Sequence, residues 1–342
     1  METITIKDIA KLCGVAVSTV SRAINNHPDI NEETKAMIMK VIKENNYIPN
    51  NSARNLKRLD SNTIAVLIKG ITNPLFSNII KTFELEIKKK KYSFILHRVE
   101  DREDEVDVAI QLEKEKRLKG IVFLGGHFFH SDEKLAQLNV PFVLSTIGST
   151  QKIDKNICSS VSVDDFKESY KLVDYLCSLG HKKIAIITAS MDDESIGNLR
   201  LNGYMKALKD NNIEIDEKLI RYMKDGIETY SMENGYMVTQ ELLESQQEFT
   251  AIYAISDTLA IGACKAIFDA GKKIPEDYSV AGFDGLDIAK YYNPSITTIR
   301  QPVEKMAQST IKILFDMIRK KTPAQHVLFQ GELVPGKSTK SI

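Results

Sequence analysis

The chain has 342 residues, enough for two or three domains, and its 43% hydrophobic content is ordinary for a globular protein. Lys plus Arg equal Asp plus Glu at 46 each, so the net charge gives no sign of a nucleic-acid partner. No run of 18 apolar residues is present, and the N-terminus lacks the apolar core of a signal peptide, so we expect a cytoplasmic protein without membrane spans.

The first 24 residues predict two short helices joined by a tight turn. Thr5 and Asp8 have the spacing of a capping box, and Gly14 stands where the first helix would end. The apolar stripe of the first helix comprises Ile6, Ile9, Ala10 and Cys13. In the second helix, Val20 and Ile24 face inward.

The outer face of the second helix is short and carries small residues with one arginine: Val17, Ser18, Ser21 and Arg22. Such a face suits insertion into the DNA major groove, where an arginine can grip a guanine. The alternative is an ordinary helical hairpin with a solvated face. Asn31 predicts the cap of a third helix, whose inner face comprises Met37, Ile38, Val41 and Ile42. In the following segment, Arg54, Lys57 and Arg58 form a cluster suited to phosphates.

From Asn62 onward, short apolar runs alternate with amphipathic stretches, which predicts parallel sheets covered by helices on both faces. The expected strands are Thr63–Ile68, Tyr92–Leu96, Gly120–Leu124, Phe142–Leu144, Ile184–Thr188, Ile220–Met223, Ala251–Ala254 and Ser279–Phe283. About 280 residues with two such sets indicate two doubly wound subdomains. Ligands bind at the carboxyl ends of parallel strands, so two facing sheets predict a cleft for a small molecule.

The chain resembles the LacI–GalR family of bacterial transcription regulators. The opening pattern is carried by Thr5-Ile-Lys-Asp-Ile-Ala, Gly14-Val15, Thr19-Val-Ser-Arg22, Glu33-Thr34, Tyr47-Ile-Pro-Asn50 and Ala53-Arg54. Further matches, in family order, are Asn73-Pro-Leu-Phe76, Leu179-Gly-His-Lys-Lys-Ile184, Arg200-Leu-Asn-Gly203, Ser256-Asp257, Gly282-Phe-Asp284 and Thr297-Thr-Ile-Arg-Gln-Pro302.

The resemblance implies a helix-turn-helix domain (1–48), a hinge helix or linker (49–60) and a core (61–342) like periplasmic sugar-binding proteins. We expect the chain to cross between subdomains near residues 160, 291 and 324, each to within several residues. The N-subdomain would then hold about 61–160 and 292–323, and the C-subdomain about 161–291 and 324–342.

For DNA contacts, the resemblance favours Arg22 as a base reader, with Val17 and Ser18 beside it. Ala16 stands where the family usually has a serine, which would cap the helix. The absence of that serine weakens the cap by about 1 kcal/mol, unless Ser18 starts the helix later. Leu56 would wedge into the minor groove from a hinge helix that forms only on DNA; the alternative is a flexible linker. The full predicted set is Thr5, Val17, Ser18, Thr19, Ser21, Arg22, Asn25, Asn50, Ala53, Arg54, Leu56 and Lys57.

For the effector, the family carries an arginine at the position of Arg200, which holds ligand oxygens. Asp284 follows an apolar strand and can accept from two sugar hydroxyls, and Phe76 offers a stacking face. Ser256 replaces a common asparagine, and Asp257 has a helix cap as its alternative role. Arg98 suits an anionic effector, with a solvated arginine as the alternative. The predicted set is Asn73, Phe76, Arg98, Arg200, Ser256, Asp257 and Asp284.

No enzyme, metal or cofactor chemistry is predicted. Gly331-Glu-Leu-Val-Pro-Gly-Lys-Ser338 satisfies the P-loop pattern, but only four residues follow it, and a P-loop needs a helix there. The six histidines form no ligand cluster by spacing, and no serine lies in G-x-S-x-G. The four cysteines are widely spaced, which favours small buried side chains.

We therefore interpret the chain as a dimeric DNA-binding regulator, most simply a repressor. It would bind a palindromic operator and respond to a sugar or sugar phosphate in the cleft. Within this class, a corepressor or a phosphoprotein partner is the alternative. Outside it, the alternative is a sugar-binding transport component, against which the first 58 residues argue. After Val334 only eight residues remain, too few for the C-terminal helix of the family's tetramers, so a dimer is expected.

Overall fold

The computed structural model describes residues 5–24, 27–45, 62–70, 73–100, 103–126, 128–147, 154, 156–190, 195–320 and 322–342. The chain divides into two compact units, Met1–Ser61 and Asn62–Ile342. The predicted start of the core at residue 61 lies beside this division. The predicted boundary between head and hinge, at residue 48, falls outside the described residues.

The first unit contains three helices, α1 (Ile6–Leu12), α2 (Val17–Ile24) and α3 (Glu32–Glu44). Thr5 precedes α1. Its backbone N–H (2.8 Å) and its hydroxyl (2.6 Å) both donate to the carboxylate of Asp8, as the capping-box spacing predicted. Asn31 caps α3 by accepting from Glu33 N–H at 2.8 Å. Buried apolar side chains from all three helices form a small core: Ile9, Ala10, Val20, Ala23, Ile38 and Ile42.

The second unit begins with a six-stranded parallel sheet in the order β11-β5-β4-β3-β1-β2. Its elements are β1 (Thr63–Ile68), α5 (Pro74–Lys89), β2 (Ser93–Arg98), α6 (Glu105–Lys116), β3 (Gly120–Leu124), α7 (Asp132–Leu135), β4 (Phe142–Ser145), β5 (Ser159–Val163) and, from the C-terminal part, α13 (Val303–Lys320) and β11 (His326–Phe329).

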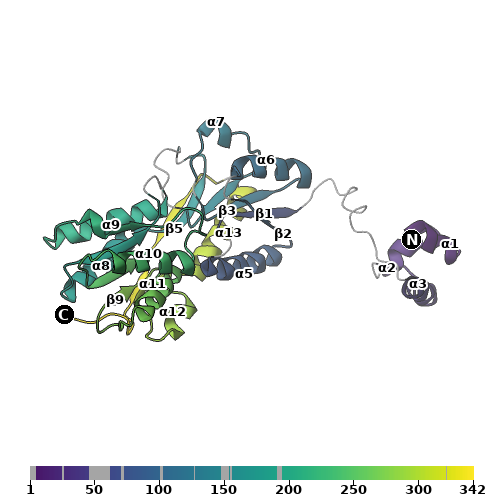
Figure 1. The fold of residues 1–342 in the computed structure, drawn as a ribbon. Coiled ribbons are helices and arrows are strands. Elements are labelled where there is room, and N and C mark those ends of the chain that lie inside the picture. Colours follow the sequence, from purple (N-terminus) through teal and green to yellow (C-terminus); the bar gives the residue numbers. More distant parts are fainter. Residues whose placement is uncertain are drawn as a thin grey trace. The chain divides into compact units, whose positions relative to one another are not determined.

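Strand β1 is buried along its whole length because helices cover both faces of this sheet. Ile64, Val66 and Ile68 belong to the cluster that includes α5 and α13, whereas Ala65 and Leu67 belong to the cluster under α6. Figure 1 shows α6 and α5 on opposite sides of the strands. The continuous apolar run at Thr63–Ile68 is therefore typical of a central parallel strand.

A second parallel sheet has the order β7-β6-β8-β9. The elements are α8 (Asp165–Ser178), β6 (Ile184–Thr188), α9 (Ile196–Asp210), η1 (Glu217–Leu219), β7 (Ile220–Tyr222), α10 (Met232–Glu244), β8 (Ala251–Ala254), α11 (Asp257–Asp269), β9 (Ser279–Ala281) and α12 (Asp287–Tyr291). Helices α10 and α11 pack so closely that a Cβ at Gly262 would overlap the carbonyl of Met232.

The predicted doubly wound α/β fold is confirmed, and eight of the observed strands overlap those expected. Two of the expected crossing points lie earlier in the chain than the pairing of the strands indicates. The chain from residue 292 stays beside the second sheet, because Thr297 pairs with Ala281 and Arg300 with Asp284. Strand β11, assigned by the boundary at 324 to the other subdomain, instead pairs with β5 in the six-stranded sheet. Its alternating exposure is that of an edge strand, which gives only a short and weak apolar pattern.

The C-terminal stretch lies against the second sheet. Strand β12 (Glu332–Val334) pairs antiparallel with β10 (Thr298–Arg300), and buried Ser338 accepts from Thr297 N–H at 2.9 Å. Part of the segment with the P-loop pattern forms β12, and the described residues 339–342 after it are not helical. Gly336 approaches the backbone of Ser295 so closely that a Cβ would overlap it, so any side chain at this position would require the segment to shift.

Helix α2 begins at Val17, so Ala16 occupies its N-cap position and Ser18 does not start the helix later. The Ala16 carbonyl accepts from Thr19 and Val20, but a methyl side chain cannot cap the free N–H groups. We expect Ala16→Ser to stabilise the first unit by about 1 kcal/mol. Hydrogen exchange of the α2 amides in the whole chain measures this. The exposed Lys40→Ala on α3 is the control, and unchanged α2 protection in Ala16→Ser would contradict the prediction.

Candidate functional site

A cavity of about 280 Å³ opens at the carboxyl ends of strands from both sheets, as the parallel topology predicts. Its walls come from segments far apart in the sequence. The polar and aromatic residues that line it include Lys69 after β1, Asn73 and Phe76 at the start of α5, Ser162 on β5, Asp165 on α8, Arg200 on α9, Tyr230 before α10, Asp284 after β9 and Gln301 after β10.

Arg200 is the centre of this polar group and is almost completely buried. Its Nε and Nη2 lie 2.9 and 2.8 Å from the same oxygen of Asp165, and its Nη1 donates to the carbonyl of Ile255. The guanidinium also lies 3.7 Å from the ring centroid of Phe283, in a cation–π arrangement. Burial alone would lower the pKa of Arg200, but Asp165 and Asp284 outweigh it and raise that pKa. Arg200 is therefore a fixed cation of the cavity wall.

Asp284 lies near the same nitrogen of the guanidinium as Asp165, with its Oδ1 3.8 Å from Arg200 Nη2. This oxygen accepts a hydrogen bond from Gln301 Nε2 at 2.8 Å, whereas Oδ2 is buried and has no hydrogen-bond partner among the described residues. Burial raises the pKa of Asp284 to about 6, although Arg200 and Gln301 act in the opposite direction. Above that pH the cavity offers a charged acceptor oxygen to a hydroxyl group.

The opposite wall comes from the start of α5. Asn73 caps this helix by accepting from Leu75 N–H at 3.0 Å, and Phe76 lines the cavity beside Gly125. Gly125 has a φ of +70°, and a Cβ there would lie 2.6 Å from Phe76 Cζ. Glycine at this position therefore lets the aromatic ring lie flat against the end of β3.

The structure brings together Asn73, Phe76, Arg200 and Asp284 from the predicted effector set, and it does not bring the other three to the cavity. Arg98 is exposed at the end of β2 and pairs with Glu100 at 3.3 Å. Ser256 caps α11 by accepting from Leu259 N–H at 3.2 Å. Asp257 is fully buried behind the cavity and accepts from Leu286 N–H at 2.7 Å. For these three, direct effector contact is not supported.

Sequence reasoning missed Asp165, Lys69 and Gln301. Lys69 directly follows a predicted strand, so the rule about carboxyl ends could have found it. Asp165 follows β5, whose sequence Ser-Ser-Val-Ser-Val has too few apolar residues to predict a strand. Gln301 was quoted only as part of a family motif. Within the described residues, no group of three or more His, Cys, Asp or Glu side chains could hold a metal ion.

In the first unit, α2 carries the predicted DNA-reading residues as its pattern indicated. Val17, Ser18 and Arg22 are exposed, Thr19 and Ser21 are half-buried, and Val20 is fully buried in the small core. Thr5 lies at the N-cap of α1 with its hydroxyl bonded to Asp8. The remaining predicted DNA contacts lie outside the described residues: Asn25, Asn50, Ala53, Arg54, Leu56 and Lys57.

Comparison with known proteins agrees with this arrangement. Residues 5–50 match the bacterial regulatory proteins of the lacI family, and residues 173–339 match a periplasmic binding protein-like domain. The HTH-type transcriptional regulator MalR of Clostridium butyricum is 42% identical over 331 residues, which are 96% of this chain and 97% of MalR.

Two solved structures resemble this chain over nearly its whole length. The lac repressor dimer bound to operator and the anti-inducer ONPF has a TM-score of 0.74 at 25% identity, covering 99% of this chain and 100% of that one. The complex of the transcriptional regulator CelR with cellobiose has a TM-score of 0.71 at 25% identity, covering 98% and 99%.

The chain belongs to the lacI family of bacterial regulatory proteins. It is a DNA-binding transcription regulator with a helix-turn-helix head and a periplasmic-binding-protein-like core, and its relatives are regulators rather than enzymes. Among the described residues, no helix is both long and apolar enough to span a bilayer.

The buried ion pairs of Arg200 predict that a substitution there lowers the stability of the core. Removing this side chain leaves Asp165 and Asp284 buried without their cation, so Arg200→Ala should lower the free energy of unfolding of the core by about 3–5 kcal/mol. Urea titration measures this. Arg98→Ala, which removes an exposed ion pair, should leave the midpoint unchanged. A wild-type midpoint for Arg200→Ala would show that the three side chains contribute no net stability.

Proposed function

We propose that this regulator is a cytoplasmic repressor whose operator binding is controlled by an uncharged sugar in the cavity. The observation that carries the proposal is the buried group of Asp165, Arg200 and Asp284, which lies in one cavity with the Phe76 ring. A fixed guanidinium donates to ring or hydroxyl oxygens, a carboxylate accepts from hydroxyls, and an aromatic face packs on the C–H side of a sugar.

The charges of the described lining favour a neutral ligand over a sugar phosphate. Arg200 is already engaged by two carboxylates, and Lys69 Nζ lies 3.0 Å from Glu105 Oε2. An incoming phosphate would meet no unpaired cation among these residues, and it would lie beside Asp284. Burying such a charge without a partner is costly, whereas hydroxyl groups exchange their water hydrogen bonds for those of the wall.

The relatives support this assignment. Cellobiose is the ligand in the CelR complex, and the lac repressor dimer is bound to its operator together with an anti-inducer. By analogy, we expect the effector to bind the operator-bound and free states with different affinity, which is what couples the cavity to DNA. A ligand that strengthens operator binding would instead make it a corepressor.

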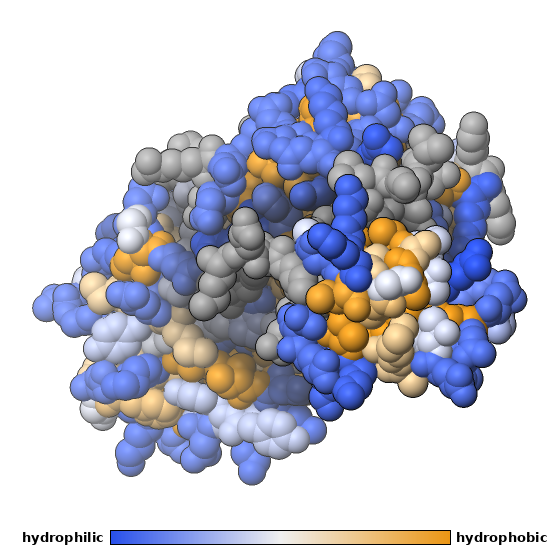
Figure 2. All heavy atoms as spheres, turned by 90° about the vertical axis from the view of Figure 1, so that its right-hand side faces the viewer, coloured by the Kyte–Doolittle hydropathy of each residue, from blue (hydrophilic) through white to orange (hydrophobic). Residues whose placement is uncertain are grey.

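We further propose that two copies assemble as a homodimer on a palindromic operator, since two heads match two half-sites. The core carries exposed large apolar side chains on α5, β2 and α12, namely Leu85, Leu96, Ile288 and Tyr291. Figure 2 shows apolar residues among hydrophilic ones on the face that it draws. A dimer interface would bring apolar side chains together in one contiguous area.

The effector proposal is tested by calorimetry with ribose, maltose and cellobiose against ribose 5-phosphate and glucose 6-phosphate. We expect a neutral sugar to bind and the phosphates to fail. Because protonation of Asp284 removes its acceptor charge, affinity should fall about tenfold from pH 7 to pH 5, around the pKa of about 6.

In Asp284→Asn this pH dependence should disappear, and affinity should be low throughout. Asp287→Asn, an exposed residue three positions along, is the matched control and should keep the wild-type profile. A sugar phosphate that binds more tightly than every neutral sugar would contradict the proposal. Gel shifts with the binding sugar then separate inducer from corepressor by the sign of the effect.

The DNA assignment is tested with duplexes selected from a random pool by the wild-type protein. Arg22→Ala should lose about 1–3 kcal/mol of discrimination between a selected and a scrambled duplex, since a bidentate base contact contributes that much. Lys40→Ala removes a charge from α3 instead and should keep full discrimination. Wild-type discrimination by Arg22→Ala would show that α2 does not read bases. Light scattering tests the homodimer separately and should give a mass of two chains for each protein.

A further inference from the structure

The turn that presents Asp284 has an unusual backbone. Asp284 has a φ of 114° and Gly285 a φ of 72°, so two consecutive residues leave the ordinary regions. A non-glycine residue in such a conformation persists only where its surroundings hold it there. A side chain at Gly285 would overlap the backbone of Arg300, so this turn also lies tightly against β10.

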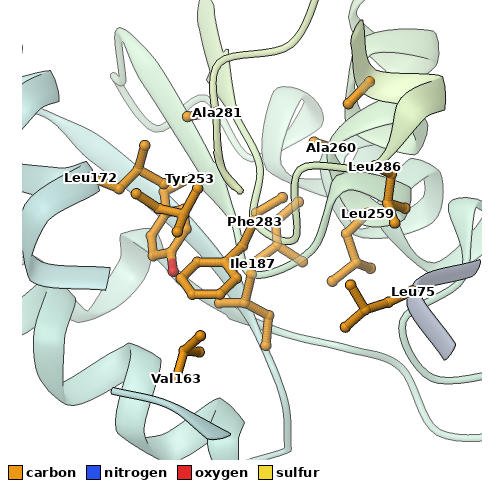
Figure 3. Packing of buried hydrophobic residues seen from close by; sticks show 14 of the residues in the cluster. Leu75, Val163, Leu172, Ile187, Tyr253, Leu259, Ala260, Ala281, Phe283 and Leu286 are labelled. Carbon is orange, nitrogen blue, oxygen red and sulfur yellow. The ribbon is translucent and has the colours of Figure 1, made fainter. Parts of the chain in front are cut away.

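Apolar side chains anchor the turn on both sides of Asp284. Figure 3 shows Phe283 in the core close to Tyr253 and Ile187, and Leu286 close to Leu259 and Ala260 of α11. Phe283 is also the ring beneath the Arg200 guanidinium. These contacts fix where the turn begins and ends. Between them, Asp284 N–H donates to the Ile299 carbonyl at 2.9 Å and Gly285 N–H to Thr298 Oγ1 at 3.2 Å, so the β10 segment holds one side of the turn.

Asp257 holds the other side of the turn, at the two residues that flank Asp284 and Gly285. Its backbone N–H donates to the carbonyl of Phe283 at 2.7 Å, and its Oδ2 accepts from Leu286 N–H at 2.7 Å. One residue therefore holds the turn at both ends. Gly282 leaves room for this, because a Cβ there would overlap Asp257 Oδ1.

We propose that Asp257 is a positioning residue of the effector site: without contacting the ligand, it holds the turn 283–286 in the conformation that presents Asp284 to the cavity. This deepens the proposed function and rests on it for the effect on binding. The sequence pattern grouped Asp257 with the direct contacts or assigned it to a helix cap. The capping bond to α11 is instead made by Ser256.

Burial penalises a negative charge on the side chain of Asp257. It is fully buried, and its Oδ1 has no hydrogen-bond partner among the described residues. Burial and then the neighbouring Asp284 raise the pKa of Asp257 well above its ordinary value, although Thr298 and the amides of Leu286 and Gly285 oppose this. The Arg200 guanidinium is directed to Asp165, Asp284 and the Ile255 carbonyl.

Two substitutions separate this role from general stability. Asp257→Asn keeps an acceptor oxygen for Leu286 N–H, so it should preserve the bond to the turn. Asp257→Ala removes the acceptor. Asp287→Ala is the matched control, because Asp287 is also the first residue of a helix but is exposed.

The measurement is hydrogen exchange of the amides of residues 283–286 in the whole chain without ligand, corrected for intrinsic rates. At pH 6, Asp257→Ala should lose at least tenfold protection there, with β1 and β3 unchanged, while Asp257→Asn and Asp287→Ala stay within twofold of wild type. If Asp257→Ala fails to fold, Asp257→Ser, which also removes the Oδ2 acceptor, takes its place in this comparison.

Unchanged protection in Asp257→Ala, or equal loss in Asp257→Asn, would overturn the proposal. Calorimetry with cellobiose, maltose and ribose supplies the binding readout, in which Asp257→Ala should weaken the bound sugar at least tenfold and Asp257→Asn should not. If no sugar binds the wild type, the proposed function fails while the exchange result still decides the role of Asp257. If protection falls and sugar affinity does not, the turn is held by Asp257 but does not position the site.

Discussion

The ion pair between Arg200 and Asp165 is the interaction on which the site depends. Both side chains are about 3% exposed, so their desolvation is offset only by close mutual contact and by further hydrogen bonds. The Ile255 carbonyl and the Phe283 ring supply the rest of the surroundings of the guanidinium. Four segments, α8, α9, the end of β8 and the turn after β9, therefore converge on one cation, and replacing it with a neutral group disturbs all four.

This convergence explains which parts of the molecule the sequence could predict. Central strands such as β1, β3, β6 and β8 are buried on both faces, so each appears as an unbroken apolar run. Strands β5 and β11 escaped prediction because serines occupy one and exposed residues alternate in the other. Their places in the sheet are set by partners more than 150 residues away, such as Val161 and Val327, and no local pattern contains that information.

The candidate site divides in the same way. Arg200 and Asp284 were predictable because one lies in a family motif and the other follows an apolar strand. Asp257 was assigned to the same set because it lies in a motif beside Ser256, yet its side chain points to the back of the turn. Sequence adjacency places a residue near a site, but the direction of its side chain depends on a backbone conformation such as the positive φ at Asp284.

The polar residues of the cavity also lie where the chain passes between the two sheets. Asp165 is two residues beyond β5, at the first passage, and Gln301 directly follows β10, at the second. Gln301 Nε2 donates to Asp284, so a residue at a passage is bonded to the proposed ligand acceptor. A rotation of one sheet relative to the other would reorient the chain segments that run between the sheets. It would therefore alter the distances among Asp165, Arg200 and Asp284. A ligand that fits only one set of those distances would favour one angle between the sheets, which is the differential affinity that allosteric control requires.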